Sequence, residues 1–268
     1  MWKTIKYIII FFALQIVCAL ALSAFFFNEL FNGDKMSLIF LASGLSSALF
    51  CLFIYLVRKD VGLSRDSFRI HPWQIVLLGV GAVVFFFLPE IKLTEILDLP
   101  DNLEGLELGS FWGLLAGGII QPVAEELLFR GAVLGALLSW RPLQGKPWMA
   151  VLLSAVLFSV IHMNPGQMPT AFLIGLLLGW LTYRTGSLLP GIVMHVFNNS
   201  VVFICALFMT EEEGEETLAD LFGSPVLEYL AIGVSLVLLI LIIRALVRLV
   251  DRHYPVRPLA PAPAEGDA

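Results

Sequence analysis

The stretch QPVAEELLFRG, residues 121–131, places three ionisable side chains inside a long apolar run. FWGLLAGGII (111–120) precedes it and AVLGALLSW (132–140) follows it. A transmembrane helix needs about 20 mostly apolar residues, so this run is long enough to cross a bilayer. Each charge at the bilayer centre costs roughly 2.5–3.5 kcal/mol on insertion scales. The stretch therefore predicts a membrane helix whose charged side chains face partners inside a helical bundle.

The overall composition is that of a membrane protein. Of the 268 residues, 59% are hydrophobic and 14% are charged, and the mean hydropathy is +0.89; soluble domains average about 25% charged residues. We expect an all-α polytopic bundle that forms a single domain over residues 1–252, with a motif-bearing core at 111–209. The Pro/Ala-rich segment 253–268 is expected to be a disordered cytoplasmic tail. About eight spans of suitable length are found in the sequence, at 5–27, 36–57, 72–89, 111–140, 148–163, 169–184, 189–209 and 225–249.

The cationic residues predict the orientation of these spans. With the N-terminus inside, the inner segments contain 13 of the 16 Lys and Arg residues, which indicates N-in and C-in topology by the positive-inside rule. These residues are Lys3, Lys6, Arg58, Lys59, Arg65, Arg69, Arg141, Lys146, Arg184, Arg244, Arg248, Arg252 and Arg257. Short loops and the lack of a recognisable organelle signal lead us to expect a prokaryotic cytoplasmic membrane.

Two longer outer loops are acidic. We interpret 89–110 as an interfacial helix or a lid, and 210–223 as a solvated exterior loop, with a cation site as the alternative. The sequence has no basic patch interleaved with aromatic residues, so it gives no indication of nucleic-acid binding. The three cysteines, Cys18, Cys51 and Cys205, lie in apolar segments, form no CxxC pair and are expected to be buried reduced thiols.

The charged stretch contains one obvious pair and one unexplained carboxylate. Glu126 and Arg130 are four residues apart, so they can pair along one helix face. Glu125 points about 100° away from Glu126 and is left without a partner on its own helix. An unpaired carboxyl group in an apolar site suits a general base or a ligand.

Two other spans also carry polar residues at helical spacing. Phe158 and His162 share one face of the fifth span, and His195 and Asn199 share one face of the seventh. Because lipid is a poor solvent for all of these polar groups, we expect them to meet Glu125 in the interior. The expected orientation puts His162 near the outer end of its span and His195 near the inner end of its span. Short spans must therefore tilt or end early for them to meet.

Two chemistries fit such a pocket, and both hydrolyse an amide. Glu125, His162 and His195 could hold Zn²⁺ with water as the fourth ligand, the open arrangement of a catalytic site. Without metal, Glu125 and His162 could activate water directly, and His195 and Asn199 could donate to the developing oxyanion. The chain has no HExxH motif, so the sequence offers no independent support for zinc.

Three motifs together resemble a known family. EELLFR (125–130), FSVIH (158–162) and HVFNN (195–199) fit the patterns EExxxR, FxxxH and HxxxN. In this order, on three helices of an eight-span protein, they resemble the CPBP family of CAAX proteases and bacteriocin-processing enzymes, also called the Abi family. Eukaryotic members cut the C-terminal tripeptide from prenylated CAAX proteins, and prokaryotic members are linked to bacteriocin maturation or self-immunity.

The resemblance implies an intramembrane endopeptidase, of metalloprotease or glutamate type, that acts on a membrane-associated or lipidated peptide. It implies that Glu125 activates water with His162, and that His195 is an oxyanion stabiliser or a metal ligand. The expected partners are membrane lipid and a peptide or protein substrate. The candidate catalytic residues are Glu125, Glu126, His162, His195 and Asn199, with Arg130 and Phe158 in support.

Two other classes of function remain open at this point. One is a catalytically silent immunity or scaffold protein that binds a peptide or a partner enzyme. The other is an ion-coupled transporter that uses the same carboxylates and histidines. Transporters often contain paired broken helices, whereas only the span with Pro122 is interrupted by proline near its centre.

Overall fold

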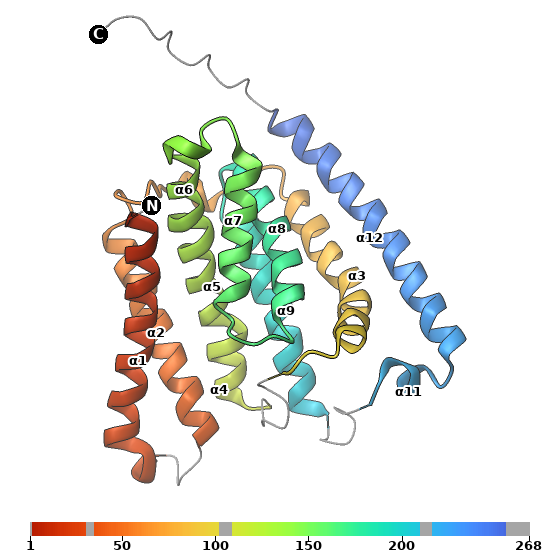
Figure 1. Ribbon diagram of the computed structural model, residues 1–268, viewed down its shortest axis with the longest axis horizontal. Coiled ribbons are helices and arrows are strands. Elements are labelled where there is room, and N and C mark those ends of the chain that lie inside the picture. The colour runs from red at the N-terminus through yellow and green to blue at the C-terminus, as the bar shows by residue number, and fades with distance from the viewer. Residues whose placement is uncertain (1, 31–34, 102–108, 210–215, 256–268) are drawn as a thin grey trace, which may run out of the picture.

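The structure, a computed structural model, describes residues 2–30, 35–101, 109–209 and 216–255. These residues form helices and contain no strand, so the all-α fold is confirmed for them. Residues 256–268 of the expected tail 253–268 and the loop segments 102–108 and 210–215 lie outside the described residues, whereas His253 is the last residue of a helix. A helical segment occupies each of the eight expected places (Figure 1). Seven are single helices, namely α1 (Trp2–Leu30), α2 (Lys35–Leu56), α3 (Gln74–Leu97), α7 (Pro147–Val160), α8 (Met168–Thr185), α9 (Leu189–Phe208) and α12 (Pro225–His253).

The remaining segment, the fourth in chain order, carries the charged stretch and is a composite helix from Phe111 to Leu138. Its parts are α4 (Phe111–Gly113), the π-helical η2 (Leu114–Ile120), α5 (Gln121–Glu126), the π-helical η3 (Leu127–Val133) and α6 (Leu134–Leu138). The irregularity expected at Pro122 is the π-helical turn that precedes it. Proline has no N–H to donate to the carbonyl four residues back, and that carbonyl, of Gly118, accepts a hydrogen bond from Ser200 of α9 instead.

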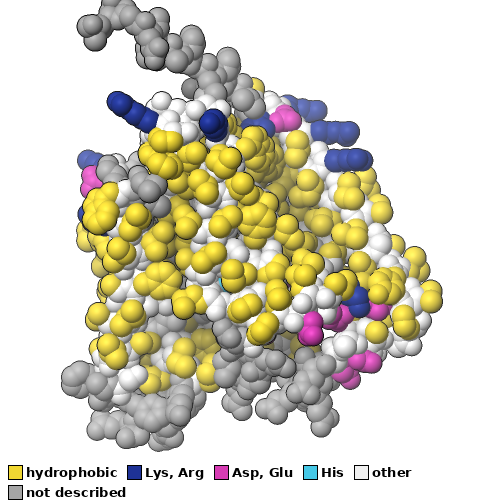
Figure 2. Space-filling model, in the orientation of Figure 1, with side chains coloured by type: hydrophobic (Ala, Val, Ile, Leu, Met, Phe, Trp, Pro, Cys, Tyr) yellow, Lys and Arg dark blue, Asp and Glu magenta, His cyan; other side chains and the backbone are white. Residues whose placement is uncertain are grey.

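The surface agrees with a membrane location. Five described helices are long and apolar enough to cross a membrane, α1, α2, α3, α9 and α12, and α7 is a shorter apolar helix. Figure 2 shows apolar side chains over the middle of the molecule, while most of the visible Lys and Arg side chains lie at one end. The protein is therefore an integral membrane protein in its fold and surface. The number of eight spans and the N-in orientation stay predictions.

Close helix packing depends on two glycines of α8. A Cβ atom at Gly175 would lie 3.2 Å from Phe158 and 3.3 Å from Ala155, and one at Gly179 would lie 3.2 Å from Val151. These positions allow α7 and α8 to approach closely, as the small-xxx-small spacing predicts. The short α7 is thereby held against the centre of the bundle.

The third span is longer than predicted, because α3 runs eight residues beyond the expected end at 89. Ion pairs hold the last turns of α3 in place. Lys92 Nζ lies 2.5 Å from Glu228 Oε1 of α12 and 2.9 Å from Glu95 Oε2. Glu95 Oε1 also accepts the backbone N–H of Leu218, the first residue of the short helix α11 (Leu218–Phe222). We name Lys92, Glu95 and Glu228 the α3–α12 clasp.

The expectation for the cysteines was wrong in one case. Cys18 is buried and Cys51 is half-buried, but Cys205 is exposed because its side chain faces away from the bundle. All three are free thiols.

Candidate active site

The composite helix buries both glutamates of the charged stretch and pairs one of them. Glu125 and Glu126 are 4% and 0% exposed, and Arg130 is 2% exposed. Arg130 Nη1 donates to Glu126 Oε1 at 2.6 Å, so the expected i,i+4 pair is present. The guanidinium also lies 4.2 Å from the ring centre of Phe158, and its Nη2 donates to the carbonyl of Gly175 at 3.4 Å. Arg130 therefore links the composite helix to α7 and α8.

His195 of α9 joins the two glutamates. Its Nδ1 lies 3.0 Å from Glu126 Oε1, and its Nε2 lies 3.7 Å from Glu125 Oε2. Nδ1 carries a proton and donates, because the facing carboxylate already accepts from Arg130 and can only accept here. The second ring nitrogen consequently faces Glu125. The convergence of α5 and α9 expected from the sequence is present in the structure.

Glu125 has a neutral partner that the sequence reasoning missed. Gln121 Nε2 donates to Glu125 Oε1 at 2.8 Å, and Gln121 Oε1 accepts from Ser43 Oγ of α2 at 2.6 Å. Gln121 stands four residues before Glu125, and this helical spacing could have revealed it. Ser43 gives no comparable signal, because only packing brings α2 to this point. The relay fixes Oε1 and leaves Oε2 toward His195.

Phe158 is the common neighbour of both histidines. The His162 ring centroid lies 4.9 Å from that of Phe158, and the His195 centroid lies 5.4 Å from it, both edge-on. The helix α7 ends at Val160, short of the predicted end at 163, so His162 lies just beyond its last turn. His162 Nδ1 lies 2.7 Å from the carbonyl of Phe158. A carbonyl only accepts, so Nδ1 donates and Nε2 is left as an acceptor in the neutral ring.

Asn199 lies near this cluster without touching its carboxylates. It is one turn beyond His195 on α9, and its Nδ2 donates to the carbonyl of Gly117 in η2 at 3.4 Å. Asn198 Nδ2 donates to Asn199 Oδ1, also at 3.4 Å. In the described residues no hydrogen bond joins Glu125 to His162 or to Asn199. The structure thus brings the candidates to one region and bonds only some of them directly.

A glycine missed by the sequence reasoning allows α9 to approach the glutamates. A Cβ atom at Gly191 would lie 2.8 Å from Glu126 Oε2, closer than ordinary van der Waals contact. This residue stands one turn before His195, so its lack of a side chain sets how near His195 comes to Glu126. A single glycine in an apolar helix carries no such information in the sequence.

The candidate zinc ligands are not arranged as a metal site in this conformation. Within the described ranges, no group of three His, Cys, Asp or Glu side chains is placed to hold a metal ion. His162 Nδ1 is engaged by its own helix, and His195 Nδ1 is engaged by Glu126. The residues as arranged do not fit a Glu125–His162–His195 ligand set, and the zinc hypothesis stays a prediction.

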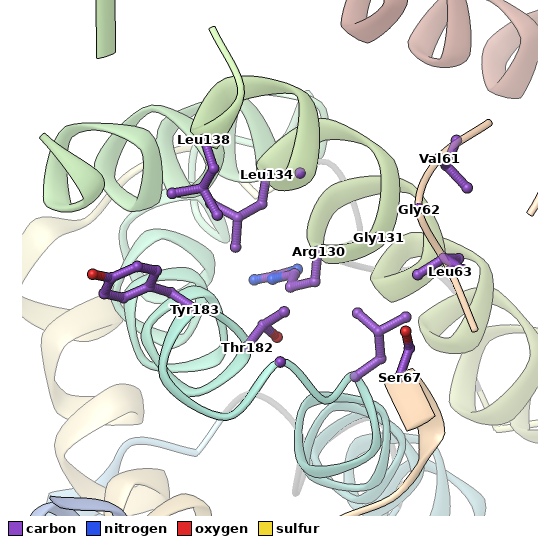
Figure 3. Close-up of a pocket in the computed structure, with 13 residues that line it drawn as sticks. Val61, Gly62, Leu63, Ser67, Arg130, Gly131, Leu134, Leu138, Thr182 and Tyr183 are labelled. Atoms are coloured by element: carbon purple, nitrogen blue, oxygen red, sulfur yellow. The ribbon is translucent and has the colours of Figure 1, made fainter. Parts of the chain in front are cut away.

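A partly open cavity of about 220 Å³ lies beside the site, toward the C-terminal end of the composite helix. Arg130 and Thr182 point into it (Figure 3). Glu125 and the two histidines do not line it. Arg130 therefore lies next to both this cavity and the carboxylate–imidazole cluster.

Fold and site together define a membrane-embedded helical protein with a buried cluster of two glutamates, an arginine and a histidine. Residues 107–201 match the family model described as Rce1-like, type II CAAX prenyl endopeptidase Rce1-like. The match covers all three motifs and confirms the resemblance to the CPBP family for this part of the chain. Residues 107–201 are thus similar to CAAX proteases. Comparisons with curated proteins and with solved structures return no match.

Proposed function

We propose that this protein is an intramembrane endopeptidase that hydrolyses a peptide bond of a membrane-associated or lipidated peptide. The observation that carries the proposal is the buried network in which His195 lies between Glu125 and Glu126, while Arg130 pairs with Glu126. The Rce1-like match supports a protease-like activity. The proposed setting is a prokaryotic cytoplasmic membrane, with membrane lipid around the bundle.

In this proposal Glu125 and His162 activate the water. Gln121 holds one oxygen of Glu125, so Oε2 is the oxygen that takes the proton. His162 donates through Nδ1, and its Nε2 therefore offers a second acceptor for the same water. The water oxygen bonds to the substrate carbonyl carbon while its proton moves to the carboxylate. The C–N bond then breaks, and the same proton passes to the leaving amine.

His195 and Asn199 are the proposed donors to the oxyanion. For His195 this role requires protons on both ring nitrogens. Glu125 and Glu126 provide two negative charges against the single charge of Arg130, so a cationic ring would bring the formal sum to zero. The side-chain N–H of Asn199 donates to the carbonyl of Gly117 at 3.4 Å, a long hydrogen bond that can be exchanged for one to the substrate.

The test compares wild type with Glu125→Gln on quenched peptides, lipidated and unlipidated, with purified protein in lipid nanodiscs. Loss of a general base lowers kcat by about 10²- to 10⁴-fold. Glu90→Gln is the matched control, because Glu90 is a half-buried glutamate of another helix, α3. This variant is expected to retain wild-type turnover.

A chelator arm and a Zn²⁺ arm decide the catalytic type. Turnover that survives the chelator identifies a glutamate-type enzyme, and turnover restored only by Zn²⁺ identifies a metalloprotease. If folded wild-type protein binds peptides but cleaves none, the protein is a binding or immunity protein and the proposal is wrong. Equal turnover in wild type and Glu125→Gln would also contradict it.

A further inference from the structure

The cavity beside Arg130 contains polar atoms that the protein leaves without partners. Thr182 Oγ1 and Arg130 Nε are buried and have no hydrogen-bond partner among the described residues. Both residues are more than nine-tenths buried, since Thr182 is 9% exposed and Arg130 is 2% exposed. Figure 3 shows both side chains directed into the space between the composite helix and α8. An unpartnered buried polar atom is costly, so such atoms mark where a small polar molecule binds.

A third unpartnered atom belongs to the catalytic cluster itself. Glu126 Oε2, the second oxygen of the carboxylate that pairs with Arg130, is also buried without a partner among the described residues. The arginine Nε–H can only donate and the carboxylate oxygen can only accept. The hydroxyl of Thr182 can do both. Water both donates and accepts, so it is a suitable partner for each of the three atoms.

Charge disfavours an anion in the same place. The guanidinium of Arg130 already pairs with Glu126 at 2.6 Å, and Glu125 stands next in the helix. Two carboxylates beside one guanidinium give a formal charge of −1 with a neutral His195 ring and zero with a cationic ring, so in neither state does the cluster have a net positive charge to hold a phosphate or a carboxylate. The cavity of about 220 Å³ is much larger than the share of liquid volume that one water occupies, about 30 Å³.

The rim of the cavity reaches the surface. Gly62 and Gly186 line the cavity and are exposed, whereas Leu134 and Leu188 form its buried wall. These glycines belong to the connections α2–η1 and α8–α9, with η1 at Asp66–Phe68. Both connections lie on the predicted cytoplasmic side. The cavity thus extends from an exposed rim to the buried Arg130.

We propose that this cavity is the entrance through which hydrolytic water reaches the buried carboxylate–imidazole cluster, with Arg130 and Thr182 as positioning residues. The inference rests on the proposed function, because it concerns the water consumed at Glu125. It adds a route and two side chains that the three motifs do not assign to water.

The first experiment measures aqueous access and does not depend on proteolysis. Thr182→Cys is prepared with Cys18, Cys51 and Cys205 replaced by alanine, in sealed vesicles of both orientations. A membrane-impermeant cationic methanethiosulfonate is added outside, and labelling is followed by mass spectrometry. Labelling is expected in the orientation that exposes the 61–67 connection. Leu138→Cys, at a second lining position, repeats the test if the first variant does not fold.

Two further variants make the access test specific. Gly135→Leu fills the cavity, because the Cβ position at Gly135 meets only the carbonyl of Val61, at 4.0 Å. It is expected to abolish labelling of Cys at 182, whereas Gly233→Leu, with nothing within 4 Å, leaves labelling unchanged. Ser154→Cys, buried away from the cavity, is expected to stay unlabelled.

The second experiment measures turnover. Thr182→Val is expected to lower kcat by about tenfold, the equivalent of one lost hydrogen bond. Gly135→Leu is also expected to lower kcat, because it fills the cavity. KM for the peptide is expected to stay unchanged in both variants. Thr182→Ser, which keeps the hydroxyl, restores kcat. If Thr182 acted only through packing, Thr182→Ser would not keep kcat higher than Thr182→Val at the same KM.

The outcomes separate this inference from the proposed function. Normal cleavage with no labelling at either cavity position would overturn the inference and leave the protease intact. Unchanged kcat in Gly135→Leu, with labelling abolished, would show that water takes another route. Labelling without cleavage by wild type would refute the proposed function, and with it the hydrolytic role of the cavity, while its hydration would stand.

Discussion

Replacing Arg130 by leucine tests whether the buried guanidinium holds the helices of the site together. Arg130 contacts Glu126 on its own helix, the ring of Phe158 on α7 and the carbonyl of Gly175 on α8. Breaking a buried ion pair in a soluble protein costs about 3–5 kcal/mol. In a membrane protein, however, the pair within one helix can persist when the helices separate.

The expected magnitude therefore comes from the contacts between helices. A desolvated cation–π contact contributes about 2 kcal/mol, and an interhelical hydrogen bond in a membrane protein contributes about 0.6 kcal/mol. Arg130→Leu is expected to lower the free energy of unfolding by about 2–3 kcal/mol. The assay is SDS titration in mixed micelles, followed by far-UV circular dichroism and tryptophan fluorescence.

Arg69→Leu is the matched control for removing an arginine from an ion pair. Arg69 pairs with Asp66 at 3.4 Å, but their side chains are 74% and 85% exposed. Such pairs contribute less than about 1 kcal/mol. If Arg130→Leu destabilises the protein no more than Arg69→Leu does, Arg130 is not a link between helices and the reasoning fails.

Three further predictions concern other contacts of the structure. Gly191→Ala puts a Cβ atom 2.8 Å from Glu126 Oε2, so kcat is expected to fall while the melting temperature changes little; full activity would show that the carboxylate can move freely. Lys92→Met leaves the buried Glu228 of the α3–α12 clasp unpaired, and is expected to destabilise the protein by about 3 kcal/mol in the same SDS titration; Lys92→Arg should recover most of this loss. Thr217 and Asp220 form a capping box at the start of α11. Hydrogen bonds from the side chain and backbone of Thr217 lower the pKa of Asp220 below its usual 3.8, so this cap stabilises the helix at neutral pH and is lost as the pH falls below about 4. Hydrogen exchange of residues 218–222 should therefore accelerate in acid, and an unchanged rate would argue against the cap.

Much of the fold follows from local sequence patterns. Apolar runs of membrane-spanning length place a helix at all eight expected positions, and the i,i+4 spacing of Glu126 and Arg130 predicts their pair correctly. Both features depend on residues close together in the chain. The ends of helices are harder to predict, because a tertiary contact can extend a helix and local hydropathy does not report such contacts. α3 continues to Leu97 with the α3–α12 clasp at its end, and α7 stops at Val160.

The sequence by itself determined the positions of the helices, the ion pair and the three motifs that resemble the CPBP family. Only the tertiary structure decided which nitrogen of His195 faces which glutamate, that Ser43 supports Gln121, and that a cavity opens beside Arg130. The physical reason is the range of the interactions. Helical periodicity acts over a few residues, whereas these contacts join side chains far apart in the chain and depend on how closely α2, α8 and α9 pack against the composite helix.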